Sequence, residues 1–136
     1  MIVLDASVLL KWFLEEEDRE KALAHWKRHI GGDETIAVPD LLFYEIANTL
    51  LLRTSLSADE IQRSLDEVRS CDLHVAAFSE IPGVPQLARR HSLTAYDASY
   101  VALAQALRCR FVTADEKLLV RLKGTPRVCH LREAIR

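Results

Sequence analysis

Cysteines are few in this 136-residue chain. Cys71, Cys109 and Cys129 are odd in number, widely spaced and form no CxxC pair, so they predict reduced thiols in a cytoplasmic protein. No apolar run approaches the ~20 residues that a membrane span needs. The N-terminus has no basic segment and Asp5 interrupts its apolar run, so we expect neither a secretory signal nor a membrane location.

The sequence also contains no internal repeat, no low-complexity segment and no interdomain linker. A chain of this length fits a single domain spanning residues 1–136 and can bury roughly two thirds of its unfolded surface. Apolar residues make up 49% and charged residues 28%, which indicates a globular chain and excludes a disordered one.

Charge is spread unevenly along the chain, although the net charge is only −2. Residues 1–83 hold 8 basic and 16 acidic side chains, whereas residues 84–136 hold 10 and 4. Two interpretations stay open. The basic C-terminal third faces an anion such as a phosphate backbone, or the two parts interleave in three dimensions and the charge evens out.

The first ten residues organise the prediction of the fold. Ile2-Val3-Leu4 is typical of a strand buried on both faces, as in a parallel sheet. Ser7 offers an N-cap oxygen for an apolar helix from about Ser7 to Leu14. Asp5 then lies at the carboxyl end of the strand, where α/β sheets place their chemistry, or else only caps this helix.

Strands and helices alternate along the rest of the chain, which predicts an α/β fold with a mostly parallel sheet flanked by helices. The acids Glu15 to Asp18 suit the start of a second helix. The further expected strands are 36–38, 73–78, 110–113 and an edge strand at 128–131, and the further expected helices are 41–52, 57–71, 84–90 and 94–107.

Carboxylates recur where these elements begin and end. Asp115 follows a buried strand, as Asp5 does, so the two share one edge of a parallel sheet. Glu45 and Asn48 share one face of an apolar helix, which is either the solvent side or a paired polar site. Asp97 lies in the first turn of a helix and, with Thr94, also matches a capping box. Clustered carboxylates need cations, and all-oxygen ligands favour Mg²⁺ or Mn²⁺ over zinc.

Other site patterns are excluded by single residues. His25 and His29 lie one helical turn apart, but no acid follows His25, so a zinc-protease motif is absent. A receiver domain needs an acidic pair near the first strand, which is missing. A haloacid-dehalogenase-type phosphatase needs a second aspartate two residues after Asp5, where Ser7 stands.

Four segments, in order, resemble the PIN-domain ribonucleases, and in particular the VapC toxins of prokaryotic toxin–antitoxin pairs, which share a PIN-like three-layer fold. They are residues 3–7 (VLDAS), 39–40 (PD) with 45–48 (EIAN), 96–98 (YDA) with 102–104 (ALA), and 113–115 (TAD). Each segment is a weak signal by itself, whereas the ordered set covers nearly the whole chain.

The resemblance implies a metal-dependent endoribonuclease in which an activated water cleaves RNA phosphodiester bonds. Asp5 and Asp97 would hold the main Mg²⁺ or Mn²⁺ ion, and Glu45 and Asp115 would complete the catalytic set. Hydroxyl or amide groups would orient these carboxylates, namely those of Ser7, Asn48 and Thr113. Glu116 and Lys117 follow the last segment where some family members carry a further acid, so one and two metal ions stay open.

The resemblance also implies partners. We expect an RNA substrate, a small antitoxin protein whose helix occupies an apolar groove near Trp12, Phe13, Phe43 and Tyr44, and a homodimer. The basic candidates for RNA contact are Arg89, Arg90, Lys117 and Arg121. The alternative function is a catalytically inactive PIN-like module that binds RNA or protein.

Overall fold

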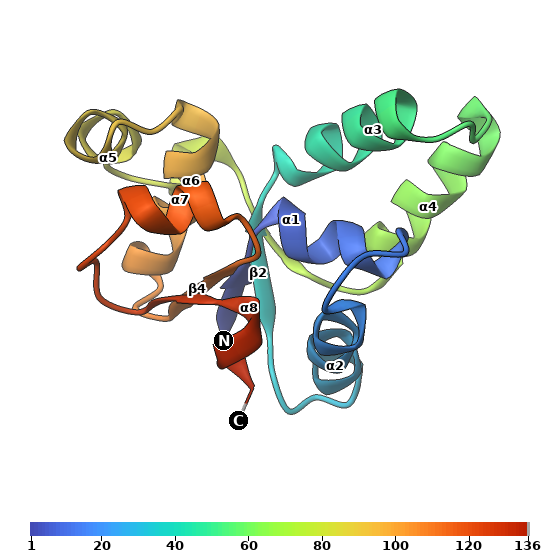
Figure 1. The fold of residues 1–136 in the computed structure, drawn as a ribbon, viewed down its shortest axis with the longest axis horizontal. Helices are drawn as coiled ribbons and strands as arrows, with labels where there is room; N and C mark the ends of the chain where they lie inside the picture. The colour runs from blue at the N-terminus through green and yellow to red at the C-terminus, as the bar shows by residue number, and fades with distance from the viewer. Residues whose placement is uncertain (136) are drawn as a thin grey trace.

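A five-stranded parallel sheet forms the centre of the computed structural model, which describes residues 1–135 (Figure 1). Its order is β3-β2-β1-β4-β5, and every neighbouring pair is parallel. The strands are β1 (Ile2–Leu4), β2 (Ile36–Pro39), β3 (His74–Ala76), β4 (Arg110–Thr113) and β5 (Val128–His130). β1 is central and buried along its length, and β5 is an edge strand, as predicted.

Helices cover the sheet in two groups. Figure 1 shows α5, α6 and α7 on one side of the strands and α2, α3 and α4 on the other. The helices are α1 (Ala6–Leu9), α2 (Arg19–Ile30), α3 (Leu42–Arg53), α4 (Ala58–Ser70), α5 (Val84–His91), α6 (Ala95–Ala106), α7 (Glu116–Arg121) and α8 (Leu131–Ala134), with 3₁₀ segments η1 (Leu10–Trp12) and η2 (Phe78–Glu80). Within residues 1–135, no helix is both long and apolar enough to cross a bilayer.

The first helix differs from its prediction at both ends. α1 begins at Ala6 and ends at Leu9, and a 3₁₀ turn replaces the rest of the expected helix. Asp5 occupies the N-cap position, and the Ser7 hydroxyl bonds the Asp5 carboxylate instead of capping the helix. The prediction of Ser7 as the N-cap was therefore wrong, because a buried carboxylate competes for its hydroxyl.

The acids of residues 15–18 precede the second helix instead of opening it. α2 begins at Arg19, and Asp18 takes a left-handed conformation with φ 62°. Glu16 lies 3.2 Å from Lys11 Nζ and 3.0 Å from Arg53, so it ties η1 to the end of α3. Ion pairs between elements therefore explain this acidic run better than the helix dipole does.

Other elements follow the sequence closely. The third strand is shorter than expected, because the η2 turn begins at Phe78. The α4 helix carries the capping box that Ser57 and Glu60 predict. The buried small residues of α6 let that helix pack closely on β1, β2 and β4.

The two histidines of α2 have structural partners. His25 is fully buried and its Nδ1 lies 2.8 Å from Glu34 Oε2. His29 Nε2 lies 2.7 Å from the carbonyl oxygen of Cys71, and its Nδ1 lies 3.1 Å from that of Glu34. These contacts fix α2 against the segment before β2 and the end of α4.

Candidate active site

Asp5 is the most buried of the four predicted acids, with 5% of its surface exposed. The hydroxyls of Ser7 and Thr113 each donate a 2.7 Å hydrogen bond to its Oδ2. Asp5 occupies the N-cap position of α1, but its carboxylate makes no capping bond to that helix. Burial raises the pKa of Asp5 from 3.8 to about 6, against the lowering effect of the Thr113 and Ser7 hydrogen bonds.

Thr113 and Ser7 link the first segment of the site to the last. Thr113 Oγ1 accepts the backbone N–H of Asp115 at 3.0 Å, and Ser7 Oγ accepts that of Ala114. Asp115 Oδ1 in turn accepts the N–H of Leu118 and caps α7. Asp5 and Asp115 are therefore held at the carboxyl ends of two adjacent parallel strands, β1 and β4.

Glu45 enters the same region from α3, where its side chain is half-buried. The hydroxyl of the fully buried Tyr100 donates to Glu45 Oε1 at 2.8 Å. Burial raises the pKa of Glu45 from 4.5 to about 7; the Tyr100 bond lowers it, while Asp5 and Asp97 raise it. Burial also holds the pKa of the Tyr100 hydroxyl well above 10, so it remains a donor.

Tyr100 was missed by the sequence analysis, which assigned the orienting role beside Glu45 to Asn48. Within residues 1–135, Asn48 makes no hydrogen bond to Glu45, although its exposed side chain lines the same hollow. The spacing could have indicated Tyr100, because it lies three residues after Asp97 on α6 and so shares its face.

Asp97 lies in the first turn of α6, and its backbone N–H donates to Thr94 Oγ1 at 3.1 Å. Thr94 therefore caps the helix through its own side chain. Burial raises the pKa of Asp97, Asp115 raises it further, and Arg121 lowers it. The Asp97 carboxyl therefore lies near enough to Asp115 and Arg121 for both charges to act on it.

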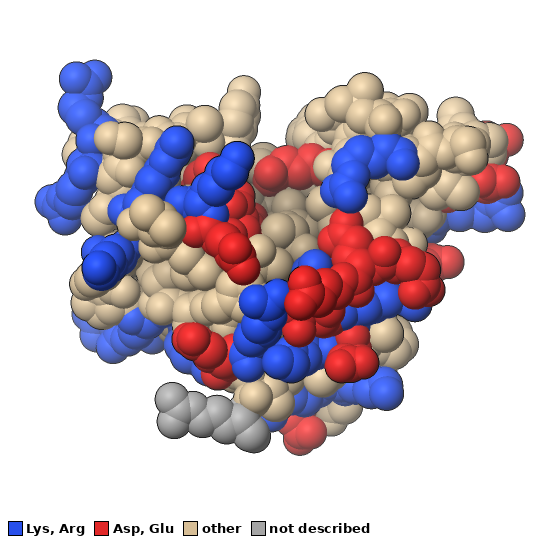
Figure 2. Space-filling model, in the orientation of Figure 1, with Lys and Arg blue, Asp and Glu red and all other residues tan. Residues whose placement is uncertain are grey.

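Two of the four acids, Glu45 and Asp97, line one hollow. It has a volume of about 680 Å³ and is lined by Leu41, Tyr44, Glu45, Asn48, Thr94, Tyr96 and Asp97. Figure 2 shows acidic side chains in the depression between α3 and the α5–α7 half, with basic side chains on both of its sides. The structure thus brings residues from α3 and α6 together across a gap of about 50 positions in sequence.

The four basic candidates lie on α5 and α7. Arg89 and Arg90 are exposed in the last turn of α5, and Lys117 is exposed on α7. Arg121 donates to the carbonyl oxygen of Ser92 at 3.0 Å and lies near enough to Asp97 to lower its pKa. On the face in Figure 2, basic side chains outline the α5–α7 half, so the charge asymmetry of the sequence persists in space.

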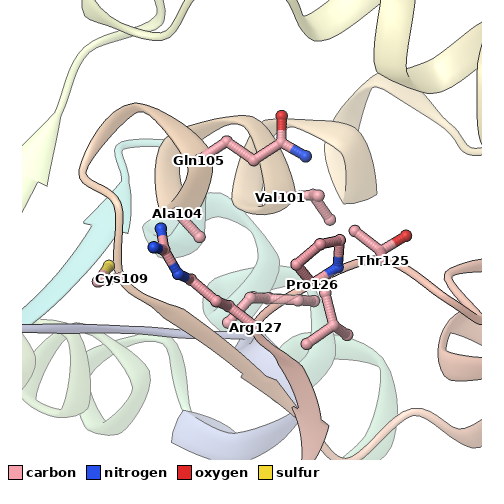
Figure 3. Close-up of a pocket in the computed structure, with 9 residues that line it drawn as sticks. Val101, Ala104, Gln105, Cys109, Thr125, Pro126 and Arg127 are labelled. Carbon is pink, nitrogen blue, oxygen red and sulfur yellow. The ribbon is translucent and has the colours of Figure 1, made fainter.

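Two further hollows lie away from the carboxylates. One, of about 300 Å³, opens between α6, β4 and the loop before β5 (Figure 3), where Pro126 and Arg127 face Val101 and Ala104. The other, of about 330 Å³, is an apolar groove between η1, α2 and α4, lined mainly by Trp12, Phe13, Leu23, Trp26 and Val68. Phe43 lies in a separate small hollow, and Tyr44 belongs to the acidic one, so the four aromatic residues expected in one groove are divided among three places.

Known proteins are similar to this chain in sequence and in fold. The PIN domain family model matches residues 2–124. Ribonuclease VapC3 of Pyrobaculum aerophilum is 32% identical over 123 residues, which are 86% of this chain and 91% of that protein. Ribonuclease VapC9 of Mycobacterium tuberculosis is 38% identical over 125 residues, 87% of this chain and 88% of that protein.

Two solved structures of other proteins have a similar fold. The crystal structure of a Pyrobaculum aerophilum protein superposes with a TM-score of 0.68 at 28% identity, over 96% of this chain and 83% of that one. A toxin–antitoxin complex from Klebsiella pneumoniae contains a chain with a TM-score of 0.72 at 18% identity, over 96% of this chain and 98% of that one, which bears on the fold alone. With the parallel sheet, the placement of the acids and the family match, the chain belongs to the PIN domain family.

Proposed function

We propose that this protein is a metal-dependent endoribonuclease and the toxin of a toxin–antitoxin pair. The observation that carries the proposal is that four acids from distant segments, Asp5, Glu45, Asp97 and Asp115, lie close enough for their charges to add to the effect of burial, which raises the pKa values of Asp5, Glu45 and Asp97. PIN family membership and the relatives named as VapC ribonucleases support the same activity.

A divalent cation suits the chemistry of this set. The donors are carboxylate oxygens, which favour Mg²⁺ or Mn²⁺, and we assign Asp5 and Asp97 as the main ligands, with Glu45 and Asp115 completing the site. Within residues 1–135, no three Asp, Glu, His or Cys side chains stand close enough to enclose one ion. Like charges repel, so this separation is what an uncompensated set of acids favours.

The side chains around the acids have defined tasks in the proposal. Ser7 and Thr113 hold Asp5 through Oδ2 and leave Oδ1 available. Tyr100 holds Glu45 through Oε1 and leaves Oε2 available to a cation or to a proton. Leu118 N–H holds Asp115 through Oδ1. When bound, Mg²⁺ would supply charge neutralisation at the RNA phosphate and a water of lowered pKa for hydrolysis of the phosphodiester bond.

We also propose two protein partners, an antitoxin and a second copy of this chain. The apolar groove between η1, α2 and α4 suits one face of an antitoxin helix, because Trp12 and Phe13 remain partly exposed there. Leu51 and Leu52, at the end of α3, are more than half exposed and suit a contact with a second copy. We also propose a cytoplasmic location, in line with the three free cysteines of the described chain.

The test is cleavage of a mixed RNA pool in Mg²⁺. Asp5→Asn keeps the shape of the side chain and removes a ligand charge, so we expect single-turnover cleavage to fall at least ~100-fold. Asp33→Asn, in an exposed turn, is the matched control and should cleave as wild type does. Equal rates for wild type and Asp5→Asn would rule out Asp5 as a ligand.

The alternative function, an inactive PIN-like binding module, makes a different prediction about metal. A module without a working site should bind Mn²⁺ weakly, and Asp5→Asn should not change that affinity. A calorimetric titration of both proteins with Mn²⁺ separates the two functions without reference to any RNA.

A further inference from the structure

Two of the three tyrosines in the chain stand exposed at the rim of the acidic hollow. Tyr44 is 80% exposed on α3 and Tyr96 is 67% exposed on α6, and both line the hollow. Within residues 1–135, neither hydroxyl makes a hydrogen bond. Each ring immediately precedes a site carboxylate in sequence, Glu45 or Asp97, so one aromatic side chain stands on each wall beside one acid.

We propose that Tyr44 and Tyr96 are stacking platforms for unpaired bases of a single-stranded RNA, one on each side of the phosphate that enters the hollow. This inference rests on the proposed ribonuclease function and deepens it by naming two residues that hold the bases of the substrate. Exposed aromatic rings beside a backbone-binding site are how proteins hold single strands, because every base offers a π-face.

The surroundings favour RNA over an apolar partner on this surface. Glu45 and Asp97 line the hollow, and covering them with an apolar helix would leave carboxylates buried and unpaired. A strand of RNA brings phosphates that a cation can join to these acids, while its bases cover the rings. Arg121 beside Asp97 adds positive charge at the same wall.

Duplex RNA should be a poor substrate on the same grounds. Its bases already stack on one another, and a platform gains nothing until a base is splayed out. Loops and single-stranded tails present free base faces. The hollow therefore selects by strand state more than by base identity, since stacking tolerates every base.

The test measures binding rather than cleavage. A short single-stranded RNA that contains 2-aminopurine is titrated in Mg²⁺ with proteins that carry Asp5→Asn to prevent turnover. Tyr44→Ala and Tyr96→Ala should each weaken binding by about 5- to 100-fold and reduce the quenching of 2-aminopurine, whereas Tyr44→Phe and Tyr96→Phe should bind nearly as wild type. Both sites lie in helices, where alanine is well tolerated, so these variants should keep the fold.

Two controls, a surface variant and a duplex RNA, distinguish loss of base stacking from other effects on binding. Ile30→Ala removes a comparably exposed apolar side chain at the far end of α2 and should leave binding unchanged. A duplex of the same sequence should bind more weakly and respond little to either alanine variant. Alanine variants that bind the single strand as wild type does, or that lower the mass of a dimer in light scattering without loss of RNA affinity, would overturn the inference.

The result is independent of the cleavage test. If the wild type fails to cut RNA, the proposed activity fails, while loss of stacking in the alanine variants would still establish a single-strand binding site. If the wild type cuts RNA and the alanine variants bind and quench normally, only the stacking platforms are wrong.

Discussion

Two neighbouring hydroxyls stabilise the buried carboxylate of Asp5. Removing a carboxylate from water disfavours its charged form, and the raised pKa of Asp5 reflects this cost. Ser7 and Thr113 offset part of it with two hydrogen bonds to the same oxygen. One hydroxyl comes from α1 and the other from β4, so the position of Asp5 depends on both segments.

Tyr100 gives a prediction at the same scale. Tyr100→Phe removes the hydroxyl donor of Glu45, so the pKa of Glu45 should rise further above 7. Mn²⁺ affinity near pH 7 should therefore fall by ~10–100-fold, as on loss of other groups that orient metal ligands. Calorimetric titration with Mn²⁺ measures this loss.

A pH series distinguishes positioning from general loosening of the fold. In Tyr100→Phe, Mn²⁺ affinity should recover as the pH rises and Glu45 deprotonates. Ser99→Ala removes a neighbouring buried hydroxyl that bonds Ala95 instead of a carboxylate, and it should leave affinity unchanged. Wild-type Mn²⁺ binding by Tyr100→Phe at every pH would exclude the orienting role.

At the scale of elements, the four acids lie where helices begin and strands end. β1 and β4 are parallel neighbours, so their carboxyl ends bring Asp5 and Asp115 to one edge of the sheet. α3 and α6 each enter this edge with their first turns, which carry Glu45 and Asp97. The packing of neighbouring elements therefore brings the acids to one edge of the sheet, although they are far apart in sequence.

The basic turn at the end of α5 gives a prediction for this scale. Arg89→Glu with Arg90→Glu should weaken binding of single-stranded RNA by about tenfold at low salt, because two phosphate contacts become repulsive. The slope of log affinity against log salt should fall in magnitude by about 1.4, since a single strand contributes roughly 0.7 per contact. Filter binding across a salt series measures both.

The matched control lies on the other group of helices. Arg63→Glu with Arg69→Glu makes the same change in net charge on the exposed face of α4. We expect this pair to change RNA affinity little. An equal loss from both pairs would mean that net charge, and not the α5 surface, governs binding.

For the whole molecule, the raised pKa values predict how stability depends on pH without metal. The carboxyls of Asp5 and Glu45 bind protons more tightly in the fold than in the unfolded chain, where their pKa values are near 4. Between about pH 4 and pH 7 the folded state therefore holds more protons, and the free energy of unfolding falls as pH rises. The rise in the pKa of Asp5 corresponds to a cost on the order of 3 kcal/mol above this range.

Thermal melts in chelator should therefore give a higher Tm at about pH 5 than at about pH 8. Asp5→Asn should reduce this difference, because its side chain does not ionise. Added Mg²⁺ should raise the Tm more at the higher pH, where the ligands are deprotonated. His25 lowers the pKa of Glu34 against the effect of burial. Ionisation of Glu34 therefore raises the free energy of unfolding as pH rises, but only at more acidic pH. A Tm that rises steadily from about pH 5 to pH 8 in chelator would contradict the placement of these acids.

The sequence by itself predicted the parallel sheet and its edge strand, because apolar runs that stop at a carboxylate mark strand ends and a capping box marks a helix start. The assignment of the four acids to one site stays a prediction. It placed Glu45 and Asn48 on one helix face but could not decide whether that face met solvent or a site. It also misplaced the start of α2, since the partners of Glu16 lie on other elements.

Which side chains meet depends on how distant elements pack. The bond from Tyr100 to Glu45 joins positions 55 residues apart, and that from Thr113 to Asp5 joins positions 108 residues apart. Local patterns carry no information about such pairs, because the packing of α3 and α6 and the order of the strands set their distances. The same packing leaves Tyr44 and Tyr96 exposed at one hollow, although the sequence analysis placed Tyr44 in an antitoxin groove and named Tyr96 only as part of a family segment.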